Sequence, residues 1–179
     1  MENKAIENIL TRSSVRLYET GAKIPSAQVE IIMRCAMAAP SAVNKQPWSF
    51  IVVNDHETLK NLADALPYAK MTEHASMAIV TCAVSDRFLS DADSSLWIQD
   101  LSAVSENILL AVHALGYGGV WTCIYPHEER IIPIRRLLAI PDNIIPFNLI
   151  PIGKPLHSAH IIDKWNPDLV HHDRWPAHD

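Results

Sequence analysis

The spacing of hydrophobic residues predicts helices and strands that alternate along the chain. Stretches with apolar residues at three- and four-residue steps indicate helices, and short runs of β-branched residues indicate strands. Helices are expected over residues 2–10, 26–39, 55–66, from Ser94 or Ser95 to Gly116, and over 127–139. Strands are expected over residues 49–53, 77–84, 119–124 and 144–152. Ser26, Asp55 and Ser94 or Ser95 have the side chains that cap helix N-termini.

The fourth helix and the fourth strand each carry an unusual pattern. The last two turns of the long helix are apolar almost all round, which is typical of a helix buried on every side. We expect its stripe of Trp97, Leu101 and Val104 to form part of a dimer core. Pro146 and Pro151 interrupt the fourth strand, which predicts a free or irregular side, because proline cannot donate to a sheet ladder.

The last 27 residues, 153–179, lack helical or strand periodicity and contain three prolines and two tryptophans. Such a segment is ordered mainly when it lies on another surface, and a partner subunit is an economical choice. We therefore predict one domain over residues 1–179, with 153–179 as an extended C-terminal arm packed on the partner of a homodimer.

Composition narrows the class of protein. With 179 residues, of which 49% are hydrophobic and 20% charged, the chain has the usage of an ordinary globular domain. The net charge of −5 and the lack of a basic run argue against a nucleic-acid partner. No apolar stretch approaches the length of a membrane span, and residues 1–10 do not have a signal-peptide pattern. We expect a soluble, cytoplasmic protein.

Cysteine and histidine residues do not form a metal-binding pattern. Cys35, Cys82 and Cys123 are widely spaced in apolar surroundings and are expected to be buried core thiols. His157, His160 and the pair at 171–172 lie in the arm, without helical periodicity to aim them and without a neighbouring cysteine. No metal is expected.

Three segments could carry chemistry. Arg12, Ser13, Ser14 and Arg16 follow the first helix and offer forked and short donors that suit a phosphate monoester, although a solvated turn would have the same residues. Residues 39–48 have a proline near each end. Their asparagine and glutamine amides could meet the edge of a flat heterocycle, or the segment could be a loop whose Trp48 fills the core. Residues 116–122 hold three glycines, which suggest a helix C-cap and a close backbone approach rather than a dinucleotide-binding motif.

In this order, the segments resemble the nitroreductase family of FMN-dependent reductases. The resemblance runs through Arg12–Tyr18, Ala39–Trp48, Phe50–Val53, Ala114–Trp121 and Ile152–Pro155 to Val170–Trp175, which is nearly the whole chain. It implies an α+β fold: a three-layer α/β/α sandwich with a central, mostly antiparallel sheet, a long central helix at the dimer interface and a C-terminal arm. It also implies FMN as cofactor, NADH or NADPH as electron donor, and a nitroaromatic, quinone or similar small acceptor.

The resemblance implies a role for each segment. The cofactor's phosphate and ribityl chain would be bound by Arg12, Ser13, Ser14 and Arg16. The isoalloxazine ring would be lined by residues of the other subunit, namely Pro40, Ser41, Ala42, Asn44 and Gln46. Backbone donors to the flavin edge would come from Trp121, Thr122 and Cys123. Lys164 would complete the phosphate site, with Lys154 as a rival.

Two other functions remain open for this fold. One is a flavoprotein with different chemistry, such as reductive dehalogenation or flavin processing, and the other is a non-catalytic FMN-binding protein. Residues 85–95 are short and acidic where larger relatives have longer excursions over the flavin, so substrate range does not transfer. No protein nucleophile is expected, because the flavin itself carries the hydride.

Overall fold

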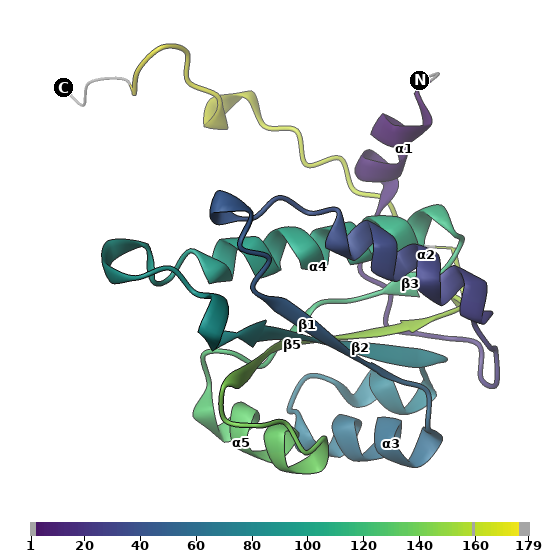
Figure 1. The fold of residues 1–179 in the computed structure, drawn as a ribbon. Helices are drawn as coiled ribbons and strands as arrows, with labels where there is room; N and C mark the ends of the chain where they lie inside the picture. The colour runs from purple at the N-terminus through teal and green to yellow at the C-terminus, as the bar shows by residue number, and fades with distance from the viewer. Residues whose placement is uncertain (1–2, 159, 176–179) are drawn as a thin grey trace.

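The computed structural model describes residues 3–158 and 160–175. Figure 1 labels the main elements along this chain. The helices are α1 Lys4–Thr11, α2 Ser26–Met37, α3 His56–Ala65, α4 Trp97–Ala114 and α5 Glu128–Leu137. The strands are β1 Trp48–Val53, β2 Met77–Val84, β3 Gly118–Gly119, β4 Thr122–Cys123 and β5 Ile144–Gly153. Short 3-10 turns are η1 Ala42–Asn44, η2 Lys70–His74, η3 Ser85–Arg87, η4 Asp91–Asp93 and η5 Pro167–Leu169.

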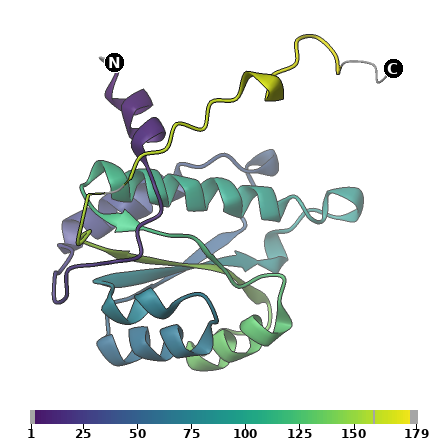
Figure 2. The same cartoon turned by 180° about the vertical axis from the view of Figure 1, so that it is seen from behind.

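The strands form one antiparallel sheet between two helical layers. The strand order is β1-β2-β5-β3, with β4 paired to β5 as well. Helices α2 and α4 cover one face, and α3 and α5 cover the other (Figures 1 and 2). The α+β class and the three-layer arrangement around an antiparallel sheet are confirmed.

Strand β5 lies inside the sheet, and of the free or irregular side that its prolines predict, the structure shows the irregular one. It pairs with β2 along one side and with β3 and β4 along the other. The register against β2 shifts between Thr81 and Cys82, opposite Pro146, so the proline is accommodated by an irregular ladder. The expected strand over 119–124 is split into β3 and β4, each two residues long.

Of the expected helix caps, one is confirmed. The Asp55 side chain accepts a hydrogen bond from the Thr58 amide at 2.8 Å. The expectation for Ser26 is wrong, because Ser26 is the first helical residue and Pro25 is the N-cap. The side chains of Ser94 and Ser95 do not cap α4 either: its N-cap is Leu96, and the first amides of the helix donate to the backbone carbonyls of Ser95 and Leu96.

The core consists of two layers of buried side chains, one on each face of the sheet. The stripe of Trp97, Leu101 and Val104 belongs to the layer under α2 and α4. The expectation that this stripe forms a dimer core is therefore wrong, because α2 and the sheet of the same chain already bury it. Of the cysteines, Cys82 is buried and burial raises its pKa to about 12, whereas Cys123 is exposed, contrary to expectation.

Candidate functional site

A large cavity lies between the segment after α1 and the first part of the C-terminal arm. Its volume is about 910 Å³, within the range of small-molecule and cofactor sites. Two stretches line it, residues 9–17 on one side and residues 157, 158 and 160–165 on the other. Figure 2 shows the arm leaving the sheet close to the chain that follows α1.

The segment after α1 is held in place by close backbone packing on the glycine-rich turn. The Val15 amide donates to the Gly119 carbonyl at 3.0 Å, and Ser14 forms a parallel bridge with Gly119. A Cβ atom at Gly118 would lie 2.5 Å from Cβ of Val15, so only glycine permits this approach. The close backbone approach expected for these glycines is confirmed, and Gly116, at φ +81°, follows the end of α4 as expected.

Tyr18 fixes the other end of the same segment. Its hydroxyl lies 2.8 Å from the Val15 carbonyl and 3.1 Å from the Pro151 carbonyl of β5. The ring is buried, and burial raises the pKa of the phenol above its ordinary value, partly offset by the nearby charge of Arg16. A neutral phenol that donates to a carbonyl is therefore a stable clamp on residues 15–18.

The two arginines of this segment differ in their surroundings. Arg12 is largely buried and its Nε lies 3.2 Å from Oε1 of Glu106 on α4, so part of its charge is already balanced. Arg16 is exposed, and among the described residues its side chain makes no ion pair or hydrogen bond. Together with Ser13 and Ser14 they line the cavity, and the Arg16 guanidinium is not engaged by any described residue.

The structure separates the two candidate lysines. Lys164 lines the cavity opposite the arginines. Lys154 is not among the lining residues, and its Nζ lies 2.9 Å from Oε2 of Glu19. The geometry therefore places Lys164, and not Lys154, with Arg12 and Arg16. Three cationic side chains and one carboxylate, Asp163, line this cavity, which favours an anionic ligand.

The segment from Pro40 to Gln46 lies elsewhere, beside the start of α4. The Ala42 amide donates to Oδ1 of Asp100 at 2.9 Å, and the Gln46 amide donates to the Ser41 hydroxyl oxygen at 3.0 Å. Asn44 and Gln46 are exposed and are joined by a 3.0 Å hydrogen bond from Nε2 of Gln46. None of these residues lines the cavity, so one chain does not bring the two halves of the expected site together.

Residues 121–123 also lie outside the cavity lining. Trp121 is half-buried and packs edge-on against Phe147, with ring centroids 5.9 Å apart. Thr122 is buried, and its hydroxyl donates to the Leu149 carbonyl at 2.7 Å. The Cys123 carbonyl accepts from Arg130 at 3.1 Å. These contacts attach the segment to β5 and α5, a position next to Gly119 and hence to Ser14.

The sequence did not assign several residues that the structure places at these sites. Ser158 and Trp165 line the cavity, as do His157 and His160, which the sequence analysis considered only as metal ligands; the arm carries no periodicity from which their direction could be inferred. Asp100 holds residue 42, and the only sequence signal was an acidic residue in the first turn of a helix, which the helix dipole alone would explain.

The chain is similar in sequence and in structure to known proteins of one family. Residues 9–67 match the model of the nitroreductase family. A protein of Archaeoglobus fulgidus, whose name places it among NADH dehydrogenase/NAD(P)H nitroreductases, is 43% identical over 175 residues, covering 96% of this chain and 99% of the relative. A crystal structure of a protein with the same name from Parabacteroides distasonis superposes with a TM-score of 0.90 at 38% identity, covering 97% of this chain and 100% of that one.

A second similar structure is named for its cofactor. It is an FMN-dependent nitroreductase from Clostridium difficile, with a TM-score of 0.86 at 25% identity, covering 95% of this chain and 99% of that chain. Within the described part of the chain, none of the helices combines the length and the apolar character that crossing a membrane requires.

Proposed function

The chain belongs to the nitroreductase family, and from this premise we propose that it is a cytoplasmic, FMN-dependent oxidoreductase that takes hydride from NADH or NADPH and reduces a small acceptor such as a nitroaromatic or a quinone. The observation that carries the proposal is that Arg12, Arg16 and Lys164 line the same cavity as Ser13 and Ser14. Three unpaired cysteines are in keeping with a reducing compartment.

The donor set of this cavity suits the phosphate end of FMN. Arginine forks and serine hydroxyls form short, charge-assisted hydrogen bonds to phosphate oxygens, and a lysine adds a point charge. Arg16 and Lys164 are exposed and face the cavity from opposite sides, so both can reach one dianion. The apolar side chains of Ile161, Ile162 and Trp165 would shield the remaining part of the ligand from water.

The other segments would orient the ring. FMN, when bound, supplies the hydride chemistry, and the protein supplies binding, orientation and electrostatics. The amides of Asn44 and Gln46 are exposed and could meet the polar edge of the isoalloxazine. The backbone around Thr122 would contribute a donor near the reacting edge, where a fixed N–H stabilises developing negative charge.

A spectrum and one assay test the proposal. The purified protein should be yellow, or become yellow after addition of FMN and removal of the excess, with one FMN bound per chain. It should then oxidise NADH or NADPH in the presence of a quinone or a nitroaromatic compound. A preparation that stays colourless would refute the proposal. A yellow protein without turnover would identify an FMN-binding protein, and one active only on a halogenated or flavin substrate would identify the alternative chemistry.

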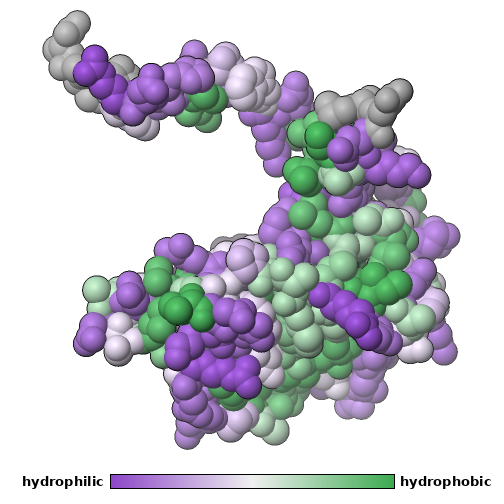
Figure 3. Space-filling view, turned by 45° about the horizontal axis from the view of Figure 1, so that its top comes forward, coloured by the Kyte–Doolittle hydropathy of each residue, from purple (hydrophilic) through white to green (hydrophobic). Residues whose placement is uncertain are grey.

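We further propose that two copies of the chain form a homodimer with shared FMN sites. Each chain would supply the phosphate half of one site and the ring half of the other, so neither site would be complete in one chain. The described arm residues 160–175 are all exposed, and hydrophobic side chains are exposed on both sides of the cavity, including Ile9, Leu10, Leu17, Ile161 and Ile162. Figure 3 shows hydrophobic surface on α1, with the arm standing apart from the body. Apolar surface of this kind is usually covered in a stable protein.

Mixing of two defective chains tests the shared site. Arg16→Glu should damage the phosphate half, and Ser41→Trp should damage the ring half, so each homodimer binds FMN weakly. In an equal mixture that has exchanged subunits, about half of the dimers contain both chains, and one of their two sites is intact. About a quarter of all sites should therefore recover FMN binding. No recovery, although mass spectrometry shows mixed dimers, would mean that each chain builds its own site.

A further inference from the structure

The segment between Ser41 and Pro47 has a strained backbone. Val43, Asn44 and Gln46 have φ values of +49°, +56° and +49°. Asparagine tolerates this left-handed region, but for a β-branched residue such as valine it is a genuine outlier. Val43 is also 81% exposed, so packing of its side chain does not offset the energetic cost of this backbone conformation. Strain of this kind persists only when surrounding contacts hold it, and it is concentrated at functional sites.

Contacts from two other parts of the chain hold the segment. Arg87, in η3, donates to the Gln46 carbonyl at 3.1 Å. Asp100, in the first turn of α4, accepts from the Ala42 amide at 2.9 Å. The remaining hydrogen bonds lie within the segment itself, such as the one from the Gln46 amide to the Ser41 hydroxyl oxygen. Residues 41–46 are thus fixed at their beginning by Asp100 and at their end by Arg87.

Asp100 is an unusual residue for this position. It is a carboxylate that is 7% exposed, and within the described chain it makes no ion pair. Burying a charge without a partner is costly, so such a residue is kept for a reason. The N-terminal end of α4 stabilises the negative charge, and the charged acceptor makes the hydrogen bond to Ala42 stronger than a neutral one would be.

We propose that Asp100 is a positioning residue of the flavin site. Through the Ala42 amide, its buried carboxylate holds residues 41–46 in the strained shape in which Ser41, Asn44 and Gln46 line the isoalloxazine ring. This inference rests on the function proposed above and adds a residue that contacts neither the cofactor nor its phosphate. Asp100 acts only through the backbone of the segment that it fixes.

The position of Asp100 predicts which part of the flavin is affected. Residues 41–46 lie outside the cavity that holds Arg12, Arg16 and Lys164. Loosening the segment should therefore weaken binding of the ring and leave the phosphate contacts unchanged. FMN and riboflavin share the ring and differ in the phosphate, so both should lose affinity by the same factor.

The test compares three variants of the full-length protein. Asp100→Ala should raise the Kd for both FMN and riboflavin by about 10- to 100-fold, the range expected for a lost hydrogen bond to a charged group. Asp100→Asn keeps the shape and one oxygen acceptor, so it should retain most of the affinity and serves if the alanine variant fails to fold. Asp93→Asn is the matched control. Asp93 and Asp100 both line a small cavity of about 10 Å³, but Asp93 is exposed and its side chain makes no hydrogen bond among the described residues.

Hydrogen exchange supplies a readout that needs no flavin. In the flavin-free protein, the amides of residues 42–46 should exchange at least about tenfold faster in Asp100→Ala than in the wild type, and Asp93→Asn should not change them. Unchanged exchange in Asp100→Ala would overturn the proposal whatever the flavin does. Faster exchange with unchanged affinity, or a loss confined to FMN, would also overturn it. A wild-type protein that binds neither flavin would refute the proposed function itself, and with it the role of Asp100.

Discussion

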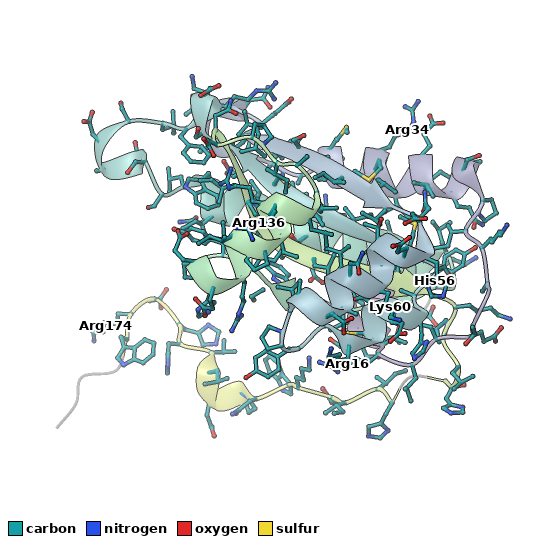
Figure 4. All side chains as sticks on the ribbon, turned by 90° about the horizontal axis from the view of Figure 1, so that it is seen from below. Arg16, Arg34, His56, Lys60, Arg136 and Arg174 are labelled. Atoms are coloured by element: carbon teal, nitrogen blue, oxygen red, sulfur yellow. The ribbon has the colours of Figure 1, made fainter. Side chains whose placement is uncertain are left out.

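Arg16→Ala is expected to weaken binding of FMN and to leave binding of riboflavin unchanged. Arg16 lines the cavity, is exposed, and makes no ion pair or hydrogen bond within the described residues. Its removal therefore takes away no contact that stabilises the fold, and any loss of affinity reports on the ligand. Arg136 on α5 is a matched control, because it is also exposed, its side chain makes no ion pair or hydrogen bond to any described residue, and it lies well apart from Arg16 in Figure 4.

The size of the effect follows from the exposure of the side chain. A hydrogen bond to a charged group contributes about 1.5–3 kcal/mol, and water competes for an exposed guanidinium, so the lower part of this range applies. At about 1.4 kcal/mol per factor of ten, the Kd for FMN should rise about 10- to 30-fold. Arg12 is a poorer probe, because its pairing with Glu106 also attaches the segment to α4, and its removal would mix binding with stability.

Titration with each flavin, followed by fluorescence quenching, measures the effect in the wild type, Arg16→Ala and Arg136→Ala. The difference between wild type and Arg16→Ala for FMN should shrink as salt is added, because an exposed ionic contact is screened. Equal losses for FMN and riboflavin would show that Arg16 does not contact the phosphate. A loss of the same size in Arg136→Ala would mean that net charge, and not position, governs the affinity.

Three further outcomes follow from other contacts. Gly118→Ala should lower the free energy of unfolding in denaturant by about 1–3 kcal/mol through its clash with Val15, and Val15→Gly in the same chain, which removes the clashing Cβ atom as well, should recover part of it. Burial lowers the pKa of His113 below its ordinary 6.5, so on acidification the unfolded chain takes up a proton before the folded one, and the free energy of unfolding should fall as the pH drops below about 6.5. His113→Gln should make the free energy of unfolding depend less on pH in this range, and an identical dependence in both proteins would show that His113 is not responsible. Lys164→Ala should weaken FMN binding and Lys154→Ala should not; the reverse order would move the phosphate contact to Lys154.

Local features of the fold could be predicted from the sequence because nearby residues decide them. The Asp55 cap depends on a residue three positions away, and the strand over 77–84 depends on its own β-branched run. The glycines at 116–119 signalled a turn and a close approach, and both are present. The position of β5 inside the sheet could not be predicted, because the register shift beside Pro146 exists only in its pairing with β2, a strand distant in the sequence.

The candidate site was predictable in its parts and not in its assembly. Periodicity shows that the stripe through Leu101 must be buried, but it does not say whether the same chain or a partner buries it. The ion pair between Lys154 and Glu19 joins residues far apart in the sequence, so it could not be predicted from the sequence around either lysine. The contact between Asp100 and Ala42 joins residues 58 positions apart, and no local pattern marks it.

Helix α4 relates the two halves of the proposed site. The Ala42 amide donates to Asp100 at the start of α4, whereas Oγ1 of Thr11 lies 2.9 Å from Nε2 of His113 at the end of α4. Thirteen residues at 1.5 Å per residue separate these anchor points by about 20 Å along the axis, so one chain holds its two halves apart. Two copies of α4 related by a two-fold axis perpendicular to them would run antiparallel, and the start of each helix would lie beside the end of the other. The anchoring of both segments on one helix is therefore what would let a symmetric dimer join residues 12–16 of one chain to the segment at Ala42 of its partner.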